Sequence, residues 1–584
     1  MPYDLVIRGG RIVDGSGRPP FSGDVAISGR SIAEVGKVTA RGRRELAADG
    51  ATITPGFVDI HTHYDGQATW ADRLQPSSWH GVTTTVSGNC GVGFAPVHAD
   101  DHDRLIELME GVEDIPQVVL REGLRWDWES FPEYLDRLAA RTFDLDVAMQ
   151  VPHAAVRVYV MRERAAARRP ASAAEIVRMS QIVQDAVRAG ALGFSSSRAL
   201  NHKTIAGELT PSYGAGAAEL AAIAAAVGQT GTGVIQFVSD SFLSPGSEAE
   251  FLAEKELLLQ LIRASRRPVS FTLTQRSEDP SFYRRVLTML TEVNAGGETL
   301  RAQVAPRGIG ILLGLPCTLH PFMMNPVWRG ISHLPVAEQA RAMAQPAFKS
   351  KLLAAQTPET EASLLGGLRI HRWHTMTELT DPPDYEPSPT DSIAAVAAAA
   401  GESPAEVAYR IMLKDGGNGL IYMPLSNYAD GSLDAVREML VHDFTLPGLS
   451  DGGAHVGTIC DGSFSTTLLQ YWARGRSRET IDLAFLVQRQ ARDTARAVGL
   501  CDRGELRPGL KADLNVIDLD GLRLRKPQAQ YDLPGGGRRL VQRADGYLHT
   551  FVSGVETYAD GTATGALPGR LVRGARAAGG RPAA

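Results

Sequence analysis

Short apolar runs rich in β-branched residues, separated by polar turn residues, occupy both ends of the chain. Residues 3–13 and 24–35 show this pattern, with Gly-Gly and Asp-Gly turn signals. The pattern returns over residues 511–518 and 549–556, and an Asp-Gly pair at 560–561 marks a further turn. It predicts short antiparallel strands at both ends.

Between these ends, apolar runs of strand length alternate with Ala- and Leu-rich stretches at helical spacing. Helices are predicted over residues 173–189, 217–227 and 252–265, each beside a short apolar run such as 190–195 or 233–238. This strand–helix alternation favours an α/β fold, with a parallel sheet closed into a distorted TIM (β/α)8 barrel. An open doubly wound sheet is the alternative, but no Gly-x-Gly-x-x-Gly stands between a predicted strand and helix.

Length and composition fit a large globular protein. The 584 residues suggest roughly four domains at about 150 residues each, and a single barrel reduces that number to two. Hydrophobic residues make up 43% and charged residues 22% of the chain, which excludes disorder and collagen as overall descriptions. The net charge of −6 provides no general basic field, so we expect neither nucleic acid nor a membrane as a partner.

The four cysteines are too few and too widely spaced for a disulfide framework. The N-terminal sequence MPYDLVIRGG lacks the long apolar stretch of a secretion signal. No uninterrupted apolar segment reaches the ~18 residues of a membrane helix. We therefore expect a cytoplasmic protein.

The most informative motif is TPGFVDIHTH, which ends in His61 and His63. Residues two apart on a strand face the same side, so both imidazoles are expected to enter one cavity. Imidazole is a common zinc ligand, and the carboxyl end of a barrel strand is where barrel active sites are built. The alternative, one buried core histidine and one exposed histidine, is disfavoured by the strand that precedes the pair.

Several motifs together resemble the amidohydrolase superfamily. They are the HTH motif with its PGFVD lead-in, LVIRGGRIVDG near the N-terminus and GELRPGLKADLNVID near the C-terminus. Three further runs, GVTTTVSGNCG, AGALGFSS and LSDG, are similar to the N-acyl-D-amino-acid deacylase (D-aminoacylase) branch. The resemblance spans nearly the whole chain.

The resemblance implies a metal-dependent barrel and one small β-sandwich domain built from both ends of the chain. On this basis, residues 1–54 and 500–570 are assigned to the β-sandwich domain and residues 55–499 to the barrel. Residues 571–584 are rich in Ala, Gly and Arg with little to bury, which predicts a disordered tail.

The resemblance also gives Cys90 and Asp451 roles in the site. The cysteine of GNCG is a metal ligand in the family, although a buried inert thiol is the alternative for Cys90. Asp451 ends the last predicted barrel strand, where a carboxylate can bind the metal and accept a proton from the attacking water. A turn aspartate next to Gly-Gly is the alternative for Asp451.

The chain departs from the deacylase pattern on the fifth and sixth strands, where the family places metal-binding histidines. The matching runs, 234–240 and 268–275, contain no histidine, and Gln236 and either Phe271 or Thr272 occupy the ligand positions. The second metal site is therefore expected to be empty. We expect one zinc per chain, held by His61, His63 and Asp451, and the sequence leaves open whether Cys90 also binds it.

Three further side chains are candidates for substrate binding: Arg198, His202 and Gln236. A planar guanidinium suits a substrate carboxylate, although a surface salt bridge is equally expected for Arg198. The function expected is hydrolysis of an amide-type C–N bond in a small molecule, an N-acylated amino acid or a related amide, with Asp451 as general base and acid. The alternatives are a hydrolase of cyclic amides or of another small C–N or ester substrate, and a non-catalytic binding or assembly protein. The sequence leaves the oligomeric state open.

Overall fold

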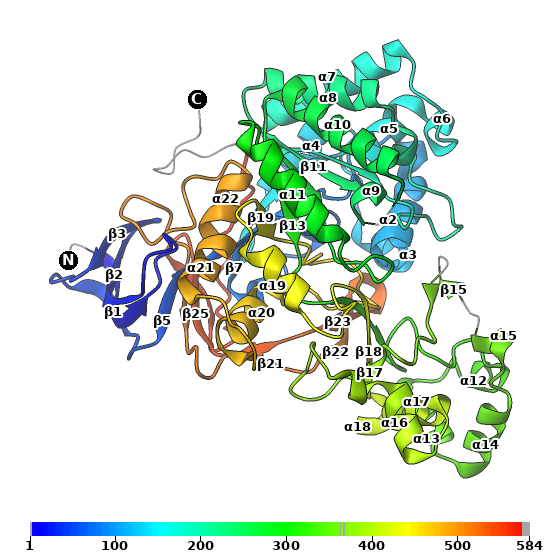
Figure 1. Ribbon diagram of the computed structural model, residues 1–584. Helices are drawn as coiled ribbons and strands as arrows, with labels where there is room; N and C mark the ends of the chain where they lie inside the picture. Colours follow the sequence, from blue (N-terminus) through cyan, green and yellow to red (C-terminus); the bar gives the residue numbers. More distant parts are fainter. Residues whose placement is uncertain (1–2, 244–245, 362–363, 366–367, 575–584) are drawn as a thin grey trace.

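The computed structural model describes residues 3–243, 246–361, 364–365 and 368–574, and Figure 1 shows the arrangement of its elements. Eight parallel strands form the centre of the molecule, and neighbouring strands pair in register along the chain order. A parallel bridge between Thr62 and Gly452 joins the segment after the first strand to the segment after the last. The eight strands are β6 (Phe57–Asp59), β7 (Val82–Ser87), β8 (Asp146–Met149) continued by β9 (Val151–Pro152), β10 (Gly193–Arg198), β11 (Val234–Ser239), β12 (Val269–Thr272), β13 (Leu300–Val304) and β19 (Thr445–Pro447).

Helices cover the outside of the barrel, as the α/β barrel prediction requires (Figure 1). The three predicted helices are α7 (Ala173–Ala189), α8 (Ala217–Gln229) and α10 (Glu248–Ser265). Helices α7 and α10 each begin with a capping box, in which the side chains of a serine and a glutamate each accept a hydrogen bond from the other's backbone amide. Other barrel helices are α2 (His102–Glu113), α4 (Phe131–Ala139), α5 (His153–Met161), α11 (Phe282–Ala295), α19 (Asp434–Val441), α21 (Leu483–Gln488) and α22 (Thr494–Ala497).

The two ends of the chain share one nine-stranded sheet, which is the β-sandwich domain of the predicted fold. Strand β5 (Thr52–Pro55) pairs with the late strand β20 (Leu514–Ile517), so the distant ends are hydrogen-bonded to each other. The other strands are β1 (Tyr3–Ile12), β2 (Phe21–Ser28), β3 (Ser31–Gly36), β4 (Gly42–Ala47), β25 (Tyr547–Val552), β26 (Val555–Ala559) and β27 (Thr562–Ala563). We keep 1–54 with 500–570, and 55–499, as the proposed domain limits.

A segment between β13 and β19 forms a second hydrophobic core. Its sheet contains β14 (Ile309–Leu313), β17 (Thr377–Glu378) and β18 (Ile421–Ser426), with helices α13 (Val336–Met343), α16 (Ile393–Ala400) and α17 (Pro404–Met412). Buried residues such as Phe322, Met343 and Met412 belong to a hydrophobic cluster separate from that of the barrel. The sequence pattern did not separate this insertion from the barrel, because its strands and helices alternate in the same way.

The predicted tail begins with residues that are packed. Leu571 forms a parallel bridge with Val147 of β8, and Val572 is 4% exposed. The rest of the predicted tail, residues 575–584, lies outside the described residues. Across the described part of the chain, no helix combines the length and the apolar character that crossing a bilayer requires.

A buried cluster of charges joins the barrel to the β-sandwich domain. The Arg503 guanidinium lies 2.8 Å from Asp146 Oδ2 on β8 and donates a hydrogen bond to Thr84 Oγ1 on β7. Lys511, just before β20, lies 2.9 Å from the same Asp146 oxygen. Arg503 is 4% exposed, so its charge depends on these partners rather than on water.

We expect Arg503→Met to destabilise the protein by about 3 kcal/mol, because it leaves the buried carboxylate of Asp146 with one cation fewer. The measurement is the midpoint of thermal unfolding. Arg507→Met is the matched control, since Arg507 is largely exposed and its ion pair with Glu505 is worth about 1 kcal/mol or less. Equal midpoints for the two variants would contradict the role given to the cluster.

Candidate metal centre

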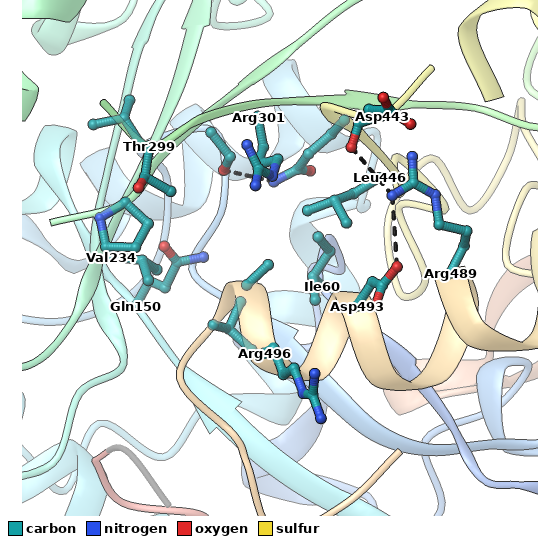
Figure 2. Close-up of a pocket in the computed structure, with 16 residues that line it drawn as sticks. Ile60, Gln150, Val234, Thr299, Arg301, Asp443, Leu446, Arg489, Asp493 and Arg496 are labelled. Carbon is teal, nitrogen blue, oxygen red and sulfur yellow. Dashed lines mark hydrogen bonds and ion pairs between the residues drawn. The ribbon is translucent and has the colours of Figure 1, made fainter. Parts of the chain in front are cut away.

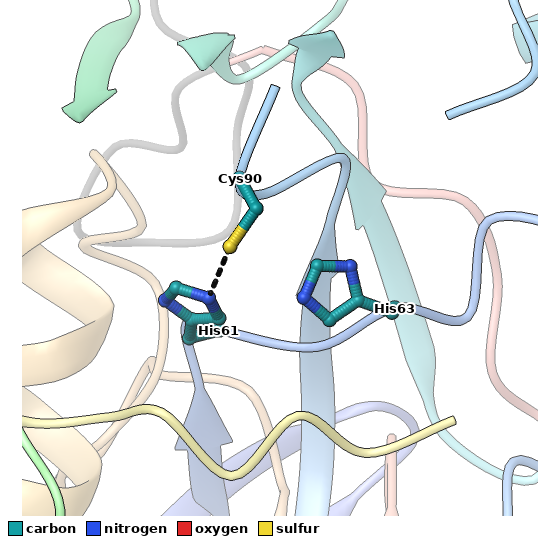
Figure 3. Close-up of side chains that lie close together, drawn as sticks. All are labelled: His61, His63 and Cys90. Carbon is teal, nitrogen blue, oxygen red and sulfur yellow. Dashed lines mark hydrogen bonds between the residues drawn. The ribbon is translucent and has the colours of Figure 1, made fainter. Parts of the chain in front are cut away.

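His61 and His63 follow β6 and lie together at the carboxyl end of the barrel, as the HTH motif predicts. Each is 1% exposed, and their ring centroids are 5.6 Å apart (Figure 3). Burial lowers the pKa of His61 to about 4. The neutral imidazole that binds metal is therefore the form of His61 at neutral pH.

Cys90 comes from the turn after β7 and completes a compact group with the two histidines. Its Sγ lies 3.3 Å from His61 Nε2 (Figure 3). One ligand atom from each of the three residues lies within 4.8 Å of the others. Burial raises the pKa of the Cys90 thiol to about 12, so a metal ion would have to displace its proton.

Asp451 follows β19, the last barrel strand, and reaches the same point from the segment that is bridged to Thr62 after β6. Its Oδ1 lies 3.4 Å from His61 Nε2 and 3.6 Å from His63 Nε2. Burial alone would raise the pKa of Asp451, but the neighbouring His63 and His61 hold it below the ordinary value. Asp451 is therefore an anion at neutral pH.

The donor atoms fit a metal ion. Among the described residues, His63 Nε2 and Asp451 Oδ1 are buried without a hydrogen-bond partner. Unpaired buried polar atoms are costly, and two that converge indicate a missing group between them. Imidazole nitrogen, carboxylate oxygen and thiolate sulfur together form a zinc-type ligand set. Cys90 and Asp451 also adopt positive φ angles of 55° and 47°, a strained conformation typical of functional sites.

Two side chains that the sequence did not indicate orient the histidines from behind. Gln303 Oε1 on β13 lies 2.6 Å from His61 Nδ1. Glu113 Oε1, at the end of α2, lies 3.4 Å from His63 Nδ1. Such partners fix the ring orientation of metal-binding histidines. Glu113 is 2% exposed. The helical periodicity of the sequence before it could have indicated that this carboxylate is buried.

We expect Glu113→Gln to lower metal affinity by about 10- to 100-fold, because the amide cannot support His63 as a carboxylate does. Competition with a coloured chelator measures the affinity. Glu110→Gln, one turn earlier on α2, is the matched control. Unchanged affinity in Glu113→Gln would show that the carboxylate does not act on His63.

The structure also shows which side chains of the fifth and sixth barrel strands, β11 and β12, face the site. Gln236 on β11 lies at the site, where its Oε1 accepts a hydrogen bond from the Cys90 amide at 3.0 Å. Gln236 pairs with Ser270 in the sheet, so Thr272 faces the barrel interior and Phe271 faces outwards, where its ring packs against Phe242. Of the two candidates for the second ligand position, Thr272 is therefore the one that faces inwards, and it offers a hydroxyl in place of an imidazole.

The two remaining candidates lie differently. His202 accepts or donates a hydrogen bond with Ser197 Oγ at 2.8 Å, and burial together with the charges of His63 and His455 lowers its pKa to about 3. Arg198 pairs instead with Glu254 of α10 at 3.0 Å, the salt bridge that was the alternative for this residue.

Comparison with known proteins identifies relatives along the whole chain. A sequence model described as the Amidohydrolase family matches residues 44–561. N-acyl-D-glutamate deacylase of Alcaligenes xylosoxydans xylosoxydans is 27% identical over 576 residues, 98% of this chain and 96% of that protein. D-aminoacylase of the same organism is 33% identical over 198 residues, 34% of this chain and 38% of that protein.

Two solved structures share the fold. A D-aminoacylase with a binuclear metal centre, in which one metal activates and the second attenuates, has a TM-score of 0.64 and 22% identity over 98% of this chain and 100% of that chain. N-acyl-D-glutamate deacylase from Bordetella bronchiseptica, solved with zinc and a phosphonate mimic of the tetrahedral intermediate, has a TM-score of 0.63 and 22% identity over the same shares. These likenesses confirm the barrel with its β-sandwich domain.

Proposed function

The chain belongs to the amidohydrolase family, in its D-aminoacylase branch, and from that premise we propose that it hydrolyses the amide bond of an N-acylated amino acid. The observation that carries the proposal is the convergence of His61, His63 and Asp451 at the carboxyl end of the barrel, with unpaired buried donor atoms between them. This is the end at which barrel enzymes place their chemistry.

We propose that His61, His63 and Asp451 hold one zinc ion. When bound, zinc polarises a substrate carbonyl and lowers the pKa of water. Asp451 Oδ1 faces the two imidazoles, whereas Oδ2 lies on the side of His455, 3.8 Å from its Nε2. Because Asp451 is ionised at neutral pH, Oδ2 can accept a proton from the attacking water and later deliver it to the leaving nitrogen.

The metal count follows from the residues on the fifth and sixth strands. Gln236 and Thr272 are poor zinc ligands, which supports one metal per chain. The D-aminoacylase with a similar fold is activated by one metal, which supports the same number here. Three protein ligands leave a position for water, whereas a fourth from Cys90 would close the site.

We expect Cys90→Ser to keep about one zinc per chain, because three ligands remain. Metal analysis of the purified variant and wild type measures the content. Loss of zinc in Cys90→Ser would make Cys90 a ligand, and two tightly held zinc ions in the wild type would contradict the single-metal proposal.

The substrate proposal rests on the deacylase relatives. The fifth and sixth strands depart from the deacylase pattern, and this departure affects which acyl group and which stereoisomer the site accepts. Turnover of N-acetyl-D-methionine, N-acetyl-D-glutamate and their L-forms, compared with a cyclic imide, tests it. We expect chelator-sensitive release of the free amino acid from a D-substrate. Turnover of the cyclic imide alone would favour a cyclic amidase, and no turnover with no bound metal would favour a binding protein.

A cytoplasmic location is part of this proposal, in keeping with four free cysteines.

A further inference from the structure

Two adjoining cavities lie at the amino ends of the barrel strands, on the opposite face from the metal centre. The inner cavity has a volume of about 360 Å³ and is lined by the starts of β11, β12 and β13 and by α22 (Figure 2). The outer cavity has a volume of about 490 Å³. Both are bordered by Pro268 and Thr299, so they adjoin each other. Barrel enzymes do not use this face for catalysis, so the cavities need another explanation.

Arginine dominates the charged residues around the cavities. Six arginines face three carboxylates, in a chain whose net charge is −6. Among the described residues, Arg266, Arg267 and Arg301 form no ion pair with a carboxylate; Arg267 and Arg301 donate only to neutral oxygens. The arginines are Arg263, Arg266, Arg267, Arg301, Arg489 and Arg496, and the carboxylates are Glu298, Asp443 and Asp493.

Two of these arginines are held near each other in the inner cavity. Arg489 is 7% exposed, lies 3.5 Å from Asp493 and keeps an unpaired buried Nε (Figure 2). Burial and then the charge of Arg489 lower the pKa of Arg301. Like charges beside a cavity repel each other; the charge of Asp493 acts in the opposite direction on Arg301, and a bound anion would offset the repulsion further.

The rest of the inner cavity is apolar with two amides. Its walls include Ile60, Val234, Leu446 and the side chain of Gln303. Gln303 also contacts His61 at the metal centre, so it is a wall between the two sites. A flat uncharged group matches such a mixture of aliphatic and amide surfaces.

We propose that this face binds a small phosphorylated molecule, with its phosphate on Arg266, Arg267 and Arg301 and its uncharged body in the inner cavity. Several guanidinium groups without a carboxylate partner suit a dianion better than a single carboxylate, because each guanidinium can bind two oxygens in a fork. A nucleoside monophosphate has both parts, and AMP is therefore the probe.

The test is isothermal titration of the zinc-loaded protein with AMP, adenosine, inorganic phosphate and acetate at constant ionic strength. We expect one AMP per chain, with weaker binding of phosphate and none of adenosine or acetate. Absence of AMP binding would overturn the proposal. Acetate that binds as tightly as AMP would overturn the assignment of a phosphate site. Phosphate that binds as tightly as AMP would overturn the assignment of the uncharged body to the inner cavity.

Variants locate the binding. Arg301→Gln and the exposed Arg266→Gln are each expected to weaken AMP binding by about tenfold or more, since each removes a charge-assisted hydrogen bond. Arg341→Gln is the matched control, because the Arg341 side chain is 76% exposed in the inserted segment, and it is expected to leave binding unchanged. AMP binding that survives in both arginine variants and disappears in His61→Ala belongs to the metal centre and overturns the proposal.

Discussion

Asp451→Asn is expected to lower kcat for hydrolysis of the N-acylated amino acid by about 10³-fold while the protein stays folded. The carboxylate is ionised because the imidazoles of His61 and His63 hold its pKa down, and an amide can neither accept the proton nor neutralise the metal charge. Steady-state kinetics with the best N-acyl-amino acid substrate measure the loss.

The control is Asp520→Asn, which removes an equally charged but fully exposed carboxylate. Metal analysis of Asp451→Asn separates two roles of the residue. Retained zinc with lost activity identifies a proton acceptor, and lost zinc identifies a ligand. Activity within about threefold of wild type would assign the proton transfer to another group, such as Glu113 or His455.

His61→Ala and His63→Ala are each expected to reduce bound zinc from about one per chain to nearly none, with complete loss of activity. Each substitution removes one of three ligands, and it also leaves Gln303 or Glu113 buried without its partner. Metal analysis after dialysis against a weak chelator measures the loss.

His98→Ala is the matched control, because the His98 ring stacks on Tyr159 and pairs with Glu129 rather than with a residue of the candidate metal centre. Zinc that remains in both HTH variants would mean that the metal is held elsewhere. A wild-type protein that contains no zinc and is unaffected by the substitutions would favour the non-catalytic alternative.

The barrel and the candidate metal ligands could be predicted from the sequence because both depend on short-range patterns. Alternation of strands and helices follows from local periodicity, and helix α7 has the predicted bounds. His61 and His63 share a face because the strand period is two. Asp451 and Cys90 entered through motifs of a few residues, and the structure brings both to the histidines.

Other features follow only from how distant segments pack. The inserted segment after β13 has the same local pattern as the barrel, and only its separate core distinguishes it. Whether Phe271 or Thr272 faced the site depended on sheet register, which pairing with β11 decides. Arg198 was ambiguous until Glu254 of α10 was placed beside it.

The sequence by itself predicted the fold class and the pair His61 and His63 from local patterns, and Asp451 through a short motif of the family that the chain resembles. The tertiary structure decided what supports them. Gln303 is 242 residues from His61 along the chain, and Glu113 comes from a helix rather than a strand end. The arginine-lined cavities likewise combine residues from strands and helices that meet only when the barrel closes. Local patterns specify which side chains face inwards, but closure of the barrel specifies which of them meet.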